Sequence, residues 1–452
     1  MNSVSLAVEG TAFHAPRRGG VEMLENCLIE VDRDGRIIEV VNPERRDHGV
    51  RRAAAADAGI LVSLGPGQYL MPGLVDLHVH APQWPQMGKA LDVPLEVWLQ
   101  KYTFPLESRY ADIDFARAVY GELVDNLLAN GTTTAMYFAT VHLEASLALA
   151  EICLEKGQRA LVGKVVMDDP EQCPPYYRDQ TAAQALADTR RFIEAVRALD
   201  PGDRPRVLPV ITPRFIPSCS DDALQGLGIL AAELGCHVQT HCSESDWANT
   251  FVRARMGKSD AASLGEFGLL TRRTVLAHAN FIDSRDMTLI RAHGAGVAHC
   301  PLSNVYFANA VFPLRAALES GMHVGLGTDI SAGYSPSLFD GCRHALSASR
   351  VLHSGVHAHL SPGERGADGE PISHHEAFWL ATAGGAEALD LPIGSFQAGY
   401  EFDALLVDTN AAASNVRIRH GSDAIEDVFQ KLVLNASRAD IASVWVGGRR
   451  VL

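Results

Sequence analysis

The sequence lacks any cluster of basic residues. It has 39 lysines and arginines against 54 aspartates and glutamates, for a formal net charge of −15 and a pI near 5.6. Proteins that bind nucleic acid neutralise phosphates with a basic patch or stripe, and none is visible here. We therefore expect no nucleic-acid partner and a small molecule as the substrate.

Long apolar runs are also missing. No stretch approaches the roughly 18 apolar residues that a membrane-spanning helix needs, and residues 1–6 do not begin a secretion signal. The eight cysteines are scattered and include no Cys-x-x-Cys pair, a usage typical of reduced, packed thiols. We expect a cytoplasmic protein that does not contact a membrane.

What the sequence does contain is an alternation of strands and helices through its middle. Helix-like stretches such as Ile113–Asn130, Thr181–Leu199 and Asp221–Leu234 separate short apolar runs. Eight such units predict an α/β fold, a (β/α)₈ barrel with parallel strands. The eight runs are Leu74–His80, Thr132–Phe138, Ala160–Met167, Val207–Thr212, Cys236–His241, Thr274–His278, Gly296–His299 and His323–Gly327.

Both ends of the chain have a β-like texture. A hairpin turn signal at Asp32–Gly35 lies between two of the early runs. We predict a small composite β-sandwich domain built from residues 1–70 and 395–452, which flank a barrel domain at residues 71–394. The β-like runs are Ser3–Val8, Cys27–Val31, Arg36–Val41 and Gly59–Leu64 at the start, and Ala404–Asp408, Val428–Leu434 and Ile441–Gly448 at the end.

Histidines and one aspartate end several of the predicted barrel strands. His78 and His80 are two residues apart, so on a strand both side chains point to the same face. His241, His278 and Asp329 each close a later run. Barrel enzymes place their catalytic groups at these strand ends, and imidazole with carboxylate suits zinc, with iron as an alternative.

Glu244 follows His241 by three residues. A carboxylate at this place can lie beside a metal without binding it and can shuttle a proton to a ring nitrogen and then to a leaving amine. The alternative is a glutamate at a helix N-terminus, with Ser243 as the cap. We give the catalytic role precedence because His241 is its neighbour.

Some absences narrow the chemistry further. The fourth predicted strand, Val207–Thr212, contains no lysine that could bridge two metals, so a single metal is favoured, and Lys164 on the third strand is predicted to be structural. Cys242 and Cys300 are close to the predicted site in the sequence. We do not expect either to bind the metal, because nitrogen and oxygen ligands already fill the set. Four other histidines follow no predicted strand and are interpreted as solvated: His357, His359, His374 and His375.

Three motifs resemble those of the amidohydrolase superfamily: Pro72–His80, His241–Glu244 and Gly325–Asp329. A narrower resemblance to its guanine deaminase family rests on further segments, and together the matches cover residues 71–333. Those segments are Ala81–Gly88, Trp98–Pro105, Pro213–Phe215 with Ser218–Ser220, and Cys300–Asn304.

The resemblance implies hydrolysis of guanine to xanthine and ammonia, with water as the second substrate, and a homodimer. It also implies one zinc ion per chain held by His78, His80, His241 and Asp329. His278 would orient the water, Glu244 would shuttle the proton, and Asp329 would also accept the proton of the water. The purine would be held by Gln83, Trp84, Arg214 and Phe215. Trp84 stands at a position where the family often has Tyr.

Three alternatives stay open. The first is another aminohydrolase of the superfamily that acts on a related purine, a nucleoside or a triazine ring, against which Gln83 and Arg214 argue. The second is a two-metal hydrolase of cyclic amides, which the lysine-free fourth strand disfavours. The third is a non-catalytic member of the fold, in which metal ligands are usually lost. A further departure from the family concerns residue 245, which is Ser where the family often has Asn. Whether Ser245 supports Glu244 in the place of that Asn stays open.

Overall fold

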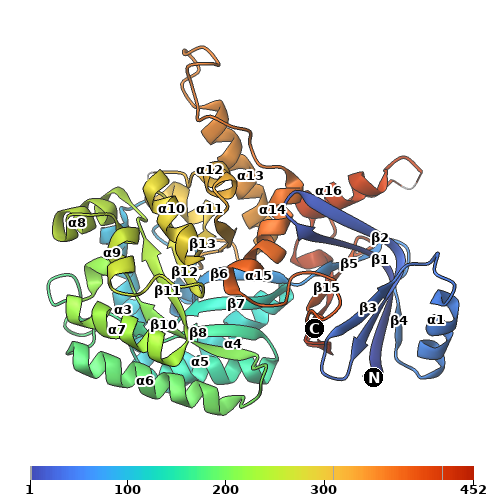
Figure 1. Ribbon diagram of the computed structural model, residues 1–452, viewed down its shortest axis with the longest axis horizontal. Helices are drawn as coiled ribbons and strands as arrows, with labels where there is room; N and C mark the ends of the chain where they lie inside the picture. The colour runs from blue at the N-terminus through green and yellow to red at the C-terminus, as the bar shows by residue number, and fades with distance from the viewer. Residues whose placement is uncertain (1–2, 309, 420) are drawn as a thin grey trace.

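Eight parallel strands form a barrel in the computed structural model, which describes residues 3–308, 310–419 and 421–452 (Figure 1). All eight predicted runs are strands, and the first and last lie side by side: His80 N donates to Ile330 O at 2.7 Å, and Asp329 N donates to His78 O at 2.8 Å. In order around the barrel the strands are β6 (Leu74–His80), β7 (Thr132–Phe138), β8 (Arg159–Gly163), β10 (Val207–Pro213), β11 (His237–Cys242), β12 (Thr274–His278), β13 (Gly296–His299) and β14 (His323–Leu326), with β9 (Val165–Val166) beside β10.

Helices cover the outer face of the barrel strands, and the inner face lies in the barrel interior. The strands are therefore buried on both faces, which is why they are continuous apolar runs. Local signals set several helix ends. Ser220 caps the start of α7 by accepting from Ala223 N, and Gly235 ends that helix with a φ of 60°. The longer helices are α4 (Ile113–Ala129), α5 (Leu143–Lys156), α6 (Ala182–Leu199), α7 (Asp221–Leu234), α8 (Asp246–Met256), α10 (Ser284–His293) and α13 (Leu338–Ser354).

Shorter helices connect these elements. Several of them follow β6 directly and lie over the carboxyl end of the barrel, where they line the site described below. They are η1 (Ala81–Gln86), α2 (Leu95–Trp98), η2 (Leu99–Thr103), α3 (Phe104–Glu107), η3 (Ser108–Ala111), η4 (Ile216–Ser218), α9 (Asp260–Glu266), α11 (Pro301–Ser303), η5 (Asn304–Ala308), α12 (Leu314–Glu319), α14 (His374–Ala381), α15 (Ala383–Leu389) and η6 (Arg438–Asp440).

Both ends of the chain build one mixed sheet beside the barrel, as Figure 1 shows in blue and red. β15 from the far end pairs with β5 from the near end, so the two segments form one domain. The predicted composite β domain is confirmed, and its strands hydrogen-bond into a continuous sheet. They are β1 (Val4–Arg17), β2 (Gly20–Asp32), β3 (Ile37–Val41), β4 (Leu61–Ser63), β5 (Gln68–Pro72), β15 (Ala404–Asp408), β16 (Ile441–Val446) and β17 (Arg449–Arg450), with α1 (His48–Asp57) between β3 and β4.

One predicted strand was wrong. Residues 428–434, expected to be β-like, lie in helix α16 (Ile425–Asn435). The buried residues of this helix are Val428, Phe429, Leu432 and Val433, and this spacing follows one face of a helix. The β-branched and aromatic composition of this segment indicated a strand. The spacing of its apolar residues instead fits one face of a helix, and this is the structure that forms.

Two general features complete the fold. Among the described residues no helix combines the length and apolar character needed to cross a membrane. All eight cysteines are buried and free, as the sequence predicted.

Candidate active site

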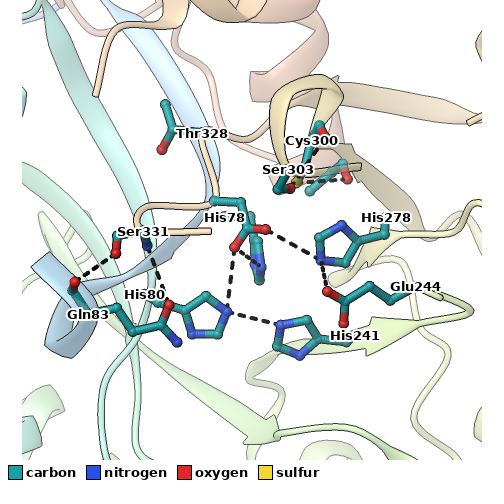
Figure 2. A network of polar contacts seen from close by, with 12 residues as sticks. His78, His80, Gln83, His241, Glu244, His278, Cys300, Ser303, Thr328 and Ser331 are labelled. Carbon is teal, nitrogen blue, oxygen red and sulfur yellow. Dashed lines mark hydrogen bonds and ion pairs between the residues drawn. The ribbon is translucent and has the colours of Figure 1, made fainter. Parts of the chain in front are cut away.

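The candidate metal ligands lie at the carboxyl ends of barrel strands (Figure 2). His78 and His80 are in β6, His241 is the penultimate residue of β11, His278 ends β12, and Asp329 follows β14. The carboxyl ends of all barrel strands open on one face, so strands far apart in the sequence bring these side chains together. The structure places all five predicted residues in one cluster.

Short distances separate these side chains. His80 Nε2 lies 3.0 Å from His241 Nε2. Asp329 Oδ1 lies 3.3 Å from His78 Nε2 and 3.6 Å from His80 Nε2. The other carboxylate oxygen, Oδ2, lies 3.8 Å from His278 Nε2. Each of the five residues is 7% exposed or less, so the cluster is withdrawn from bulk water.

The donor atoms of this cluster fit a metal ion. One nitrogen each from His78 and His80 and one oxygen of Asp329 lie within 4.8 Å of one another. Within the described parts of the chain, His78 Nε2, His278 Nε2 and Asp329 Oδ2 are buried without a hydrogen-bond partner. Because buried polar atoms are normally satisfied, unpaired nitrogen and oxygen atoms that converge in this way indicate a metal site.

An apolar floor lies beneath the imidazoles. The ring of Phe138, at the end of β7, lies 4.8 to 4.9 Å from the rings of His78, His80 and His241. Burial, followed by neighbouring positive groups, lowers the pKa of these three histidines well below the usual value. The rings are therefore neutral, which is the state that a metal ligand requires.

Contacts behind two of the imidazoles orient them. His241 Nδ1 donates to the carbonyl oxygen of Arg214 at 2.6 Å. His278 Nδ1 donates to Asn304 Oδ1 at 3.0 Å, and the same oxygen accepts from Asn280 Nδ2 at 3.2 Å. With its proton on Nδ1, each ring presents the lone pair of Nε2 to the cluster. Asn280 and Asn304 were not recognised as functional from the sequence.

The backbone at the strand ends adopts an uncommon conformation. Ser243 has a φ of 45°, His278 of 70° and Asp329 of 52°, values that residues other than glycine rarely adopt. Asp76 holds the turn before Asp329, because its carboxylate accepts from Thr328 N at 3.0 Å and Thr328 Oγ1 at 2.6 Å. Residues in such conformations concentrate at functional sites, where the surroundings hold them in place.

Glu244 lies beside the cluster and outside the following helix. Its Oε1 is 3.6 Å from His278 Nε2, and burial, with the nearby charge of Asp329, raises its pKa to about 8. The interpretation of Ser243 as a helix cap was wrong: Ser245 caps α8, whereas Ser243 Oγ donates to Asp260 at 3.0 Å. Ser245 thus fixes the loop that carries Glu244.

A cavity opens over the cluster. Gln83, Arg214 and Phe215 line it together with His80, His241, Glu244 and Asp329, and apolar side chains of Leu95, Trp98 and Leu99 form another wall. Trp98, the first residue of the segment Trp98–Pro105 that carries the resemblance, lies on this wall. Lys101, in the same segment, is exposed on η2 and does not line the cavity.

Trp84 does not form part of this wall. Its Nε1 donates to Glu122 Oε1 on α4 at 3.0 Å, and its ring packs in the main hydrophobic core. The expectation that Trp84 holds the purine is corrected: the indole nitrogen is already satisfied, and the leucines and Trp98 occupy the place beside the cavity.

Glu107 is a further residue beside the site that no sequence pattern indicated. It is fully buried, accepts from Arg214 Nη1 at 2.6 Å and Nη2 at 3.2 Å, and accepts from Gln83 Nε2 at 2.9 Å. Burial disfavours the charge of Arg214, but Glu107 outweighs this effect and raises the pKa of Arg214. A buried bidentate pair of this kind holds the guanidinium in one orientation.

The remaining candidates lie elsewhere. Lys164 is structural as predicted, since its Nζ donates to Asp179 at 2.9 Å. His357 and His359 are exposed as predicted. The prediction for His374 and His375 was wrong: both are half-buried, and their Nε2 atoms lie 2.9 and 2.7 Å from Glu426 Oε1. Those contacts join α14 to α16.

The two cysteines near the site differ. Cys300 Sγ lies with donor atoms of His278 and Asp329 within 4.8 Å, whereas Cys242 belongs to no such group among the described residues. Burial raises the pKa of the Cys300 thiol well above its usual value, and its Sγ donates to Ala298 O at 3.5 Å. A protonated thiol is a poor metal ligand, so the histidines and Asp329 remain the better ligand set.

Comparison with known proteins places this geometry in a family. The model of the amidohydrolase family matches residues 69–451. A Schizosaccharomyces pombe protein named "Probable guanine deaminase" is 41% identical over 98% of this chain and 82% of its own length. The guanine deaminase of Homo sapiens is 35% identical over 98% of this chain and 96% of its own length.

A solved structure agrees with the sequence relatives. The guanine deaminase of C. acetobutylicum, solved with guanine bound in its active site, superposes with a TM-score of 0.87 at 28% identity and covers 99% of this chain and 100% of its own. The chain therefore belongs to the amidohydrolase family and, within it, to the guanine deaminases.

Proposed function

We propose that this protein hydrolyses guanine to xanthine and ammonia with one zinc ion per chain. One observation carries the proposal: the buried cluster of imidazoles and Asp329 shares a cavity with a buried arginine and glutamine that can recognise a purine edge. The choice of guanine as the substrate is supported by the guanine deaminase relatives, one of which binds guanine.

His78, His80, His241 and Asp329 would hold the metal. A zinc ion bound there supplies Lewis-acid chemistry, which lowers the pKa of water toward neutrality. A zinc ion is proposed because three imidazoles and one carboxylate are a zinc-type donor set, and one ion because β10 carries no lysine that could bridge two.

The side chains around the cluster perform the proton transfers. Asp329 accepts a proton from the attacking water, and His278 orients that water through Nε2. Glu244, whose raised pKa lets it hold a proton near neutral pH, gives that proton to a ring nitrogen, then takes the proton of the new hydroxyl group and passes it to the leaving amine. The proton held by Asp329 returns to Glu244 and completes the cycle. The new C–O bond forms at the carbon that bore the amine, the C–N bond breaks, and ammonia leaves.

The test is ammonia release from guanine, adenine, guanosine and cytosine by the purified, metal-analysed protein. We expect turnover of guanine alone, because a buried cation opposite the amino group of adenine leaves both groups unpaired. Arg214→Ala should reduce kcat/KM for guanine severely with the metal retained, whereas Arg109→Ala, an exposed arginine on η3, should have no effect. A preference for adenine or a nucleoside would contradict the proposal.

A further inference from the structure

Glu107 is buried behind the residues that line the cavity. It ends the short helix α3, it is 0% exposed, and it contacts the two polar residues on that side of the cavity, Gln83 and Arg214. The proton-transfer scheme above makes no use of this carboxylate. A buried polar network of this kind, when its hydrogen bonds are satisfied, holds its members in fixed orientations.

The contact with Glu107 determines the orientation of the Gln83 amide. Both carboxylate oxygens of Glu107 accept from Arg214, and the NH₂ group of Gln83 donates to one of them at 2.9 Å. The amide oxygen then faces the opposite way, where Ser331 N lies 3.4 Å from it (Figure 2). Ser331 Oγ also donates to the backbone oxygen of Gln83 at 2.7 Å, which holds the residue on its other side.

The same carboxylate orients Arg214. Both terminal nitrogens of the guanidinium donate to Glu107, and the guanidinium carbon lies 5.0 Å from the ring centre of Phe104. Arginine has five N–H donors and no acceptor. The donors that Glu107 leaves free are the only hydrogen-bonding groups that Arg214 can offer to a ligand in the cavity that it lines.

We propose that Glu107 is a positioning residue that fixes the hydrogen-bond polarity of the cavity, with Gln83 as an acceptor and Arg214 as a donor. The inference rests on the proposed function, since it assigns to this pair the selection of a 6-oxopurine. Such a ring offers an oxygen acceptor beside an N–H donor, whereas a 6-aminopurine offers the reverse pattern. With Glu107 in place, Gln83 cannot rotate its amide to suit the reversed pattern.

The test compares two inhibitors that lack the 2-amino group, hypoxanthine and adenine, in the metal-loaded protein. In the wild type, hypoxanthine should bind more tightly than adenine. Glu107→Gln should reduce the ratio of the two inhibition constants about tenfold or more, the effect of one hydrogen bond, because an amide at position 107 can donate and Gln83 can then rotate. KM for guanine should rise with the metal content unchanged.

Three variants separate this role from simple packing. Glu107→Asp remains an acceptor only, so it should preserve the inhibitor ratio even though its shorter side chain raises KM. Glu96→Gln, at an exposed site on α2, should change neither quantity. Should Glu107→Gln fail to fold, Gln83→Met tests the acceptor directly and should also lower the ratio.

The outcomes distinguish this inference from the proposed function. Equal weakening of both inhibitors by Glu107→Gln, or an unchanged ratio in Gln83→Met, would overturn the role of Glu107. A wild-type protein that does not turn over guanine would instead contradict the proposed function, and this measurement precedes the others.

Discussion

At the scale of single residues, Glu244 combines two properties that a proton shuttle needs. It lies 3.6 Å from His278 without belonging to the proposed ligand set, and burial raises its pKa to about 8. Glu244→Gln keeps the shape of the side chain but cannot transfer a proton, so we expect kcat to fall by about 10²–10⁴. Steady-state ammonia release measures this change.

The control for this variant is Asp246→Asn, at an exposed site two residues later, which should keep near-normal kcat. Elemental analysis should find the metal in both variants. A Glu244→Gln protein that loses its metal, and regains full activity when metal is added, would show that the glutamate supports the site without shuttling protons.

The proposed ligand residues were predictable because they lie at or near the ends of short apolar runs, and strand ends converge in a barrel. Glu107 and Asn304 were not predictable in this way. Glu107 meets Arg214 across 107 positions of sequence. Asn304 ends a segment that carries the family resemblance, but its contact with His278 spans 26 positions. Their roles come from contacts between distant segments, which periodicity and spacing do not report.

At the scale of elements, Glu376 at the start of α14 joins two helices. It accepts from both terminal nitrogens of Arg315 on α12 at 2.9 Å and forms a capping box with Ser373. Burial acts to raise the pKa of Glu376, but the bonds from Arg315 and Ser373 outweigh burial and lower it below 4.5. Ionised Glu376 therefore stabilises the fold fully when the pH is above the pKa of this glutamate in the unfolded chain. This stabilisation is lost as the pH falls through the lowered pKa of the folded protein.

We expect Glu376→Gln to reduce the free energy of unfolding at pH 7 by about 2 kcal/mol, the scale of hydrogen bonds to a charged group. The difference from the wild type should shrink below about pH 4.5, where the unfolded glutamate is also protonated. Denaturant unfolding at several pH values measures this. Glu319→Gln, an exposed residue 4.0 Å from the same arginine, should have little effect; an equal loss in both variants would contradict the interpretation.

The elements themselves were predicted unequally. The barrel strands are buried on both faces, so their apolar runs stand out between helices, and all eight were found. Helix α16 was missed because most of its apolar residues are β-branched or aromatic, a composition shared with strands. The apolar residues of α16 pack in the main hydrophobic core. This tertiary packing overrides the local preference of the segment for a strand.

At the scale of the whole molecule, the proposed metal would join residues from the first and the last strands of the barrel. β6 and β14 contribute His78, His80 and Asp329, and β11 contributes His241. Elemental analysis should find one zinc per chain, and a chelator should abolish activity that added metal restores. Because a metal that binds only the folded chain stabilises it, metal at one hundred times Kd should raise the free energy of unfolding by about 2.7 kcal/mol.

Asp329→Asn provides the matched comparison, since it retains the size of the side chain and removes the charge of one ligand. It should lose turnover, and added metal should stabilise it less than it stabilises the wild type in thermal unfolding. Because the proposed ligands lie where backbone hydrogen bonds join the first segment of the barrel to the last, the stabilisation should extend to the whole barrel and appear as a shift of its main unfolding transition. Two equivalents of metal per chain, or full activity in a chelated protein, would contradict the single-metal site.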